Sequence, residues 1–164
     1  MTSQGGTSDL SNLIRTMRPT LHPSTFIFCH ILSSPSSTSR PQAPHLPSLP
    51  TNLEIQCLFR EAEGWTLIAT EASLQRSLEA ETEGSLEAIR EQVDDASNRW
   101  CMITLNVHSS LLAVGFIAAV AQRLKMSGIP SNVIAGYFHD HIFVPEGKVR
   151  DTMVALEAMS REQS

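Results

Sequence analysis

The chain has few basic residues, and this limits the partners that it can have. Its 164 residues include 12 Lys and Arg against 17 Asp and Glu, which gives a formal net charge of -5. The basic residues are scattered and form no stripe that could neutralise a row of phosphates. We therefore expect no nucleic acid among the partners of this protein.

A long apolar run and a secretory leader are also missing. The longest apolar stretch, residues 111–121, is far shorter than the roughly 20 residues that cross a bilayer. The N-terminal sequence MTSQGGTSDLSNL has neither the basic start nor the apolar region of a signal peptide. These absences predict a cytoplasmic protein without a membrane partner, and they indicate that residues 111–121 belong to a buried helix.

Cysteine is scarce as well. The three cysteines, Cys29, Cys57 and Cys101, are widely spaced, and each lies in a segment that reads as a strand. An odd number at this spacing argues against a disulfide framework and against a zinc cluster. We expect free thiols that are largely buried.

Motifs for catalysis or for a cofactor are absent too. The sequence contains no Gly-rich phosphate loop, no HExxH and no GxSxG. His108 is next to Ser109, but adjacent side chains at the end of a strand point apart and cannot form a nucleophile and base pair. We therefore expect no catalytic residue, no cofactor and no enzymatic activity.

One histidine cluster leaves a metal site open as an alternative. His139 and His141 alternate on one face of a predicted strand and could bind a metal ion if His108 converged with them. The interpretation that we favour places no metal here, and Asp140 then orients a histidine or fixes the hairpin.

The N-terminal part begins with a small polar segment and a short helix. Residues 1–7 are small and polar and predict disorder, after which Ser8 or Asp9 can cap a helix that ends before Pro19. The apolar side of that helix would carry Leu10, Leu13, Ile14 and Met17. The next segment, residues 26–32, reads FIFCHIL and is typical of a buried strand.

Residues 33–50 differ in composition from everything around them. Ser and Pro dominate this segment, and no apolar period survives in it. Because proline supplies no backbone donor and serine competes for backbone hydrogen bonds, we expect a disordered insertion. The alternative is a Pro-rich docking site for a partner domain.

The remaining upstream elements suggest a small α/β module followed by an acidic connection. Strands are predicted at residues 53–59 and 65–69, with a helix near residues 71–78. The acidic tract after it carries Leu86, Ile89 and Val93 at helical spacing, which favours an amphipathic helix with a solvated acidic face over a metal site. We therefore expect an N-terminal module at residues 8–80, an acidic linker or helix at 81–99 and a C-terminal module at 100–160.

The C-terminal module reads as strand, helix, strand, strand, helix. We expect a strand at residues 102–107, a helix that Ser109 or Ser110 caps and that ends at Gly128, strands at 132–135 and 142–144, and a last helix from Pro145. The buried side of the last helix would carry Val149, Met153, Leu156 and Met159. A ferredoxin-like unit needs a fourth strand after this helix, but almost no chain follows it. The sequence therefore predicts that the two halves exchange a strand.

Two stretches of this module, VHSSLLAVGF and SNVIAGYFHDHIFVP, closely resemble the ACT domain of small stand-alone proteins related to the arginine-sensing CASTOR family. The resemblance covers about the last 60 residues well, and the N-terminal half more loosely. It implies an α/β (α+β) fold of ferredoxin-like ACT modules that bind an amino acid beside the first strand-to-helix turn. Related proteins often carry an acidic residue where this chain has Leu112, so the rim of the site is expected to differ.

The candidate binding residues follow from that resemblance together with the chemistry of the turn. The turn at residues 107–115 presents unpaired N–H groups at the positive end of a helix dipole, where a carboxylate can bind. The predicted site is His108, Ser109, Ser110, Leu111 and Gly115, facing Asn132, Val133 and Ile134. Each has a purely structural alternative: the serines can cap the helix, Gly115 can permit close packing, and Asn132 can bond within its own turn.

The sequence thus favours a small regulatory protein that binds a free amino acid. Binding would change the contacts of the protein with a second copy in a homodimer or with a regulated protein partner. The alternative is a non-sensing dimerisation or interaction module. An exposed sheet edge invites pairing with a second copy in either case.

Overall fold

The computed structural model describes residues 6–32, 49–80 and 87–162. Its elements are α1 (Leu10–Thr16), β1 (Pro19–Leu32), β2 (Ile55–Arg60), β3 (Gly64–Thr70), α2 (Glu71–Ala80), α3 (Glu87–Asp94), η1 (Ala96–Asn98), β4 (Trp100–Leu105), α4 (Phe116–Met126), β5 (Asn132–Ala135), β6 (Asp140–Pro145), η2 (Glu146–Lys148) and α5 (Val149–Glu162). Most of the predicted disordered start and of the Ser/Pro insertion, and Leu86, lie outside the described residues.

The chain folds into two compact units that do not follow its sequence halves. Residues 6–23 and 101–162 form the first unit, and the described residues between 24 and 100 form the second. The strand β1 contributes to both, with its beginning in the first unit and its end in the second. The division into modules at residues 8–80 and 100–160 comes from the sequence alone and remains a prediction.

The first unit is a ferredoxin-like α/β module with a borrowed strand. Its strands lie in the order β1, β4, β6, β5, and β5 pairs with β6 in an antiparallel hairpin that sets Val133 opposite Ile142. The beginning of β1 thus takes the place beside β4 where a fourth strand belongs. Asn106 fixes this junction, since its amide donates to Arg18 O at 3.1 Å and to Thr20 Oγ1 at 2.6 Å. The predicted strand exchange is confirmed.

The strand β1 begins earlier than the sequence predicts. The expected strand covers residues 26–32, but β1 starts at Pro19 and includes Pro23. A proline lacks a backbone donor, which normally argues against a strand. It is tolerated at the first residue of a strand and on outer strands, and β1 is the outer strand of the first unit.

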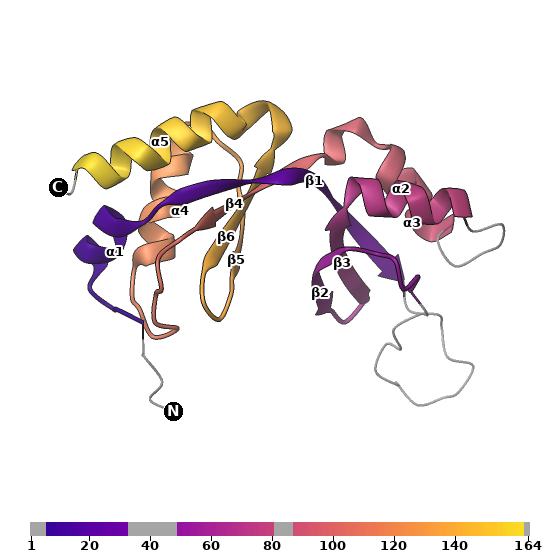
Figure 1. Cartoon of the computed structure of the whole chain (residues 1–164), viewed down its shortest axis with the longest axis horizontal. Coiled ribbons are helices and arrows are strands. Elements are labelled where there is room, and N and C mark those ends of the chain that lie inside the picture. Colours follow the sequence, from indigo (N-terminus) through magenta and orange to yellow (C-terminus); the bar gives the residue numbers. More distant parts are fainter. Residues whose placement is uncertain (1–5, 33–48, 81–86, 163–164) are drawn as a thin grey trace. The chain divides into compact units, whose positions relative to one another are not determined.

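Three helices and the inner strands enclose the core of the first unit. The helices α1, α4 and α5 contact one another (Figure 1). Asp9 caps α1, as predicted, because its Oδ1 accepts from Ser11 N at 3.1 Å. The buried core residues are Leu13, Ile14, Met17, Ile103, Leu105, Phe116, Val120, Leu124, Ile129, Ile142, Val144, Leu156 and Met159.

The second unit places β3 between β1 and β2, antiparallel to both. The helices α2 and α3 contact each other, and α2 contacts β3 (Figure 1). Ile89 and Val93 of α3 are buried, so the predicted amphipathic helix is present. The buried core residues of this unit are Ile27, Cys29, Ile31, Leu67, Ala69, Leu74, Leu78, Ile89 and Val93.

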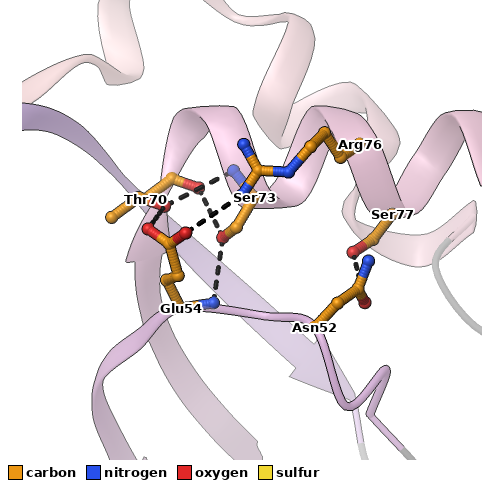
Figure 2. A network of polar contacts seen from close by, with 6 residues as sticks. All are labelled: Asn52, Glu54, Thr70, Ser73, Arg76 and Ser77. Carbon is orange, nitrogen blue, oxygen red and sulfur yellow. Dashed lines mark hydrogen bonds and ion pairs between the residues drawn. The ribbon is translucent and has the colours of Figure 1, made fainter.

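A polar network fixes the start of α2 to the segment that precedes β2 (Figure 2). Ser73 Oγ donates to Thr70 O at 3.0 Å and accepts from Glu54 N at 3.1 Å. The carboxylate of Glu54 accepts from Thr70 Oγ1 and from the guanidinium of Arg76, both at 3.0 Å. Farther along the helix, Ser77 Oγ donates to Asn52 Oδ1 at 3.1 Å. Each of the six residues therefore makes at least one hydrogen bond to another member of the network.

We expect Leu13→Ala to destabilise the first unit by about 2–5 kcal/mol, because it leaves a cavity in the core that α1 completes. Amide hydrogen exchange should show faster exchange in α4 and α5. The control is Leu21→Ala, since Leu21 lies in β1 but is exposed. Equal protection in the two variants would contradict the assignment of α1 to this core.

We expect Ser73→Ala to cost about 1–3 kcal/mol, because it removes a fully buried hydroxyl and leaves Glu54 N–H without its acceptor. Arg76→Ala is the control and should cost at most about 1 kcal/mol, since its ion pair with Glu54 is exposed. Thermal unfolding measures both, at about 2–4 °C for each kcal/mol. A larger effect of Arg76→Ala would show that the ion pair holds the network.

Candidate functional site

The loop between β4 and α4 is longer than the sequence predicts. The strand β4 ends at Leu105 rather than at residue 107, and α4 begins at Phe116 rather than directly after the serines. The predicted N-caps, Ser109 and Ser110, are therefore wrong. The N-cap is Gly115, whose φ of 92° lies in the left-handed region that side chains avoid. Ser110 Oγ instead accepts from Leu112 N at 3.2 Å inside the loop.

The first turn of α4 has free backbone donors. Among the described residues, no acceptor bonds the N–H groups of Phe116, Ile117 and Ala118, and Gly115 offers no side chain to cap them. The first hydrogen bond of the helix runs from Ala119 N to Gly115 O at 2.8 Å. These donors lie at the positive end of the helix dipole, so they favour an anion. The other end closes as predicted, with Gly128 at a φ of 65°.

The N-terminal segment holds the loop in place. Thr7 forms a parallel bridge with Ser109, in which Thr7 N donates to His108 O at 3.1 Å and Ser110 N donates to Thr7 O at 3.0 Å. The sequence predicts disorder through Thr7, but these backbone bonds order it. Gly6 packs so closely that a Cβ there would stand 2.5 Å from Ser109 C. The position of the loop therefore depends on a residue without a side chain.

A cavity of about 140 Å³ lies between this loop, the first turn of α4 and the β5–β6 hairpin. Its lining residues are Ser109, Ser110, Leu111, Ala113, Gly115, Phe116, Ile117, Ala118, Ala135 and Asp140. Four of the predicted site residues, the two serines, Leu111 and Gly115, thus meet at one cavity. The free N–H groups belong to residues in the same lining.

Asp140 is the charged residue of this lining. Its side chain is 5% exposed, and its Oδ2 accepts a hydrogen bond of 3.1 Å from Ser109 Oγ. Burial raises the pKa of this carboxyl above its usual value, and the Ser109 hydrogen bond and the neighbouring histidines oppose that rise only partly. The sequence predicts that Asp140 orients a histidine or fixes the hairpin, and it does not place Asp140 in the site. The available signal is an acidic residue just before the apolar segment 142–144.

The other predicted site residues do not line the cavity. His108 is exposed, with its ring 5.9 Å from that of Phe138. Asn132 is exposed on β5 opposite Phe143, and Val133 packs against the core of the first unit. Ile134 is opposite His141. The part of β5 that reaches the cavity is its last residue, Ala135.

The structure gives no support to the metal alternative. Within the described ranges, no three His, Cys, Asp or Glu side chains come close enough to hold a metal ion. His141 Nδ1 instead shares a hydrogen bond of 3.0 Å with Thr104 Oγ1, and burial lowers its pKa. The cysteines are free, and burial raises the pKa of Cys29 to about 12, which keeps this thiol protonated.

No described helix has the length and apolar character needed to cross a membrane.

Comparisons with known proteins agree with the fold. The family model of the ACT domain matches twice, with one model at residues 5–81 and another at residues 96–158. A Vibrio cholerae protein of unknown function, VC0802, described as a possible transport protein, is 33% identical over 93% of this chain and 97% of that chain, with a TM-score of 0.63. No curated protein matches the chain.

Two aspartate kinase structures share the fold at low identity. The ligand-free regulatory subunit of aspartate kinase from Thermus thermophilus is 10% identical over 89% of this chain and 98% of that chain, with a TM-score of 0.57. A structure of aspartokinase alpha and beta subunits is 11% identical over 87% of this chain and 97% of that chain, with a TM-score of 0.58. At this identity the likeness concerns the fold alone.

We expect Gly6→Ala to displace the loop at residues 108–110, because the new methyl group would overlap its backbone. Overpacking of this kind costs about 1–3 kcal/mol. The amide of Ser110, which donates to Thr7 O, should then exchange faster with solvent. Gly147→Ala is the matched control, since a Cβ there meets nothing within 4 Å. Unchanged exchange at Ser110 in Gly6→Ala would show that the segment is not needed to hold the loop.

Proposed function

Because this chain belongs to the ACT-domain family and carries two ACT domains in tandem, we propose that it is a regulatory protein that binds a free α-amino acid in the cavity beside Asp140. ACT domains are typically regulatory and ligand-binding modules. The observation that carries the proposal is one cavity in which a buried carboxylate and a helix start with free N–H groups both line the wall.

This arrangement matches the two charges of an amino acid. The ammonium group has three donors and no acceptor, so it suits the carboxylate of Asp140. The ligand carboxylate suits the N–H groups of Phe116, Ile117 and Ala118, where the helix dipole is positive. Ser109 Oγ donates to Asp140 Oδ2 and so orients that carboxylate. The proposed site therefore keeps Ser109, Ser110, Leu111 and Gly115 of the predicted site and adds Asp140, while Asn132 does not line the cavity.

The finer parts of the proposal rest on the sequence. We place the protein in the cytoplasm, as a relative of the CASTOR family without catalytic activity, nucleic-acid partner or membrane partner. It acts as a homodimer or on a regulated protein partner. The outer strand β5 supports pairing with a second copy, since β6 is its only neighbour in the described sheet.

The second candidate function is an interaction module that senses no ligand. Five large apolar side chains of the first unit are exposed in the loop before α4 and in the β5–β6 turn: Leu111, Leu112, Val114, Tyr137 and Phe138. Exposed apolar residues in one region are typical of a protein interface. An amino-acid binding assay separates this candidate from the first.

We expect Asp140→Asn to abolish the response to amino acids without destabilising the ligand-free protein. A ligand at about 100 times its dissociation constant adds about 2.7 kcal/mol, which is roughly 5–10 °C at this size. A thermal-shift panel of amino acids should show such a shift in the unmodified chain, and the variant should lose it. The variant should melt at the same or a higher temperature without ligand at neutral pH, because it removes a carboxylate whose ionisation is opposed by burial.

The matched control is Asp151→Asn, which makes the same change at an exposed position of α5. It should keep the shift. The sign of the pH dependence follows from the raised pKa of Asp140: its contribution to stability is present below the ordinary Asp pKa and is lost as the pH rises through the raised value. Ligand affinity should change in the opposite sense and fall on acidification. A shift that survives in Asp140→Asn, or a flat panel on folded protein, would contradict the proposal.

A further inference from the structure

We infer that the amino acid bound in this cavity has a small, uncharged side chain. This inference rests on the proposed function and narrows it to a class of ligand. It follows from the charge, the size and the wall of the cavity.

The cavity has a countercharge for the head group and none for a side chain. Asp140 is the ionisable residue among the lining residues, and its carboxylate pairs with the ligand ammonium group. The carboxylate of the ligand accepts hydrogen bonds from the free N–H groups of α4. A further charge, such as the guanidinium of arginine or the second carboxylate of glutamate, would meet the lining without an ionic partner. Unpaired charges are costly to place against apolar surfaces.

The size of the cavity fits a ligand of few atoms. Its volume is about 140 Å³, and an engineered cavity of about 150 Å³ binds benzene, which has about six non-hydrogen atoms. Alanine also has about six, and serine and valine have one or two more. A long side chain would have to leave the cavity.

The lining beside Asp140 carries small and apolar side chains. Ala135 is opposite Asp140 in the β5–β6 ladder, and both line the cavity. Side chains of directly opposite residues in an antiparallel pair lie on the same face, about 4.5–5.5 Å apart at Cβ. The methyl group of Ala135 therefore stands beside the carboxylate that holds the ammonium group. Ala113 and Ala118 are also small, and Leu111, Phe116 and Ile117 supply apolar contact.

Isothermal titration of the full chain with single amino acids tests the inference. Glycine, alanine, serine and valine form one set, and lysine, arginine, aspartate and glutamate form the other. We expect dissociation constants at least about tenfold lower for the best member of the first set than for any member of the second. Asp140→Asn should abolish binding of that ligand.

Ala135→Leu tests the role of the wall. Because Ala135 is exposed on the outer strand β5, the larger side chain should be tolerated by the fold. It should weaken valine binding by about tenfold or more and glycine binding much less. The control is Ala62→Leu, at an exposed position of the second unit, which should change neither. Ala135→Val gives a smaller change of the same sign if the leucine variant does not fold.

The outcomes separate the inference from the function that it rests on. Tightest binding of a charged amino acid, lost in Asp140→Asn, would overturn the inference and leave the proposed function intact. Equal weakening of valine and glycine by Ala135→Leu would overturn the assigned role of the wall. Binding of no amino acid to folded protein would overturn both.

Discussion

The pairing of the first residues of β1 with the strands of the C-terminal sequence is the constraint on which the first unit depends. The segment 101–162 supplies β4, β5 and β6 but no strand for the place beside β4, and the beginning of β1 takes that place. The same N-terminal segment carries α1 into the core and brings Thr7 to the loop before α4. The candidate site therefore requires residues that lie about 100 positions before it in sequence.

Much of this architecture could be predicted from local patterns and from the number of strands that a ferredoxin-like unit needs. The strand at residues 132–135 and the helix end at Gly128 are predicted from the apolar residues between Pro130 and Gly136 and from the conformational freedom of glycine, and both are confirmed. The exchanged strand follows from a topology that lacks its last member. Such predictions succeed where the structure depends on residues close in sequence, or where a sheet lacks a strand that another segment must supply.

The candidate site was predicted in part, because its geometry depends on contacts that spacing does not encode. Ser109 and Ser110 are of a residue type that commonly caps helices. The helix nevertheless starts at Phe116, after Gly115 with its φ of 92°. Asp140 and Ala135 meet only because the hairpin register sets them opposite each other, two residues after Val133 turns toward the core. A shift of one residue in that register would exchange the two faces of β5 and bring different side chains to the cavity.

The two units differ in how their buried polar groups are paired, and this difference supports the candidate site in the first unit. In the second unit, Thr70, Ser73 and Ser77 are buried and bond to groups within one network, so they need no further partner (Figure 2). Among the described residues there, the buried side-chain group without a partner is the neutral Nε1–H of Trp65. In the first unit, the donor that the described residues offer to Asp140 is the neutral hydroxyl of Ser109, and Asp140 lies on a cavity that also exposes a helix start without a side-chain cap. A buried carboxylate with a single neutral donor opposes folding, and a cationic group in the cavity removes that cost. The ammonium group of the proposed ligand is such a cation, so the pairing of Asp140 supports the proposed binding.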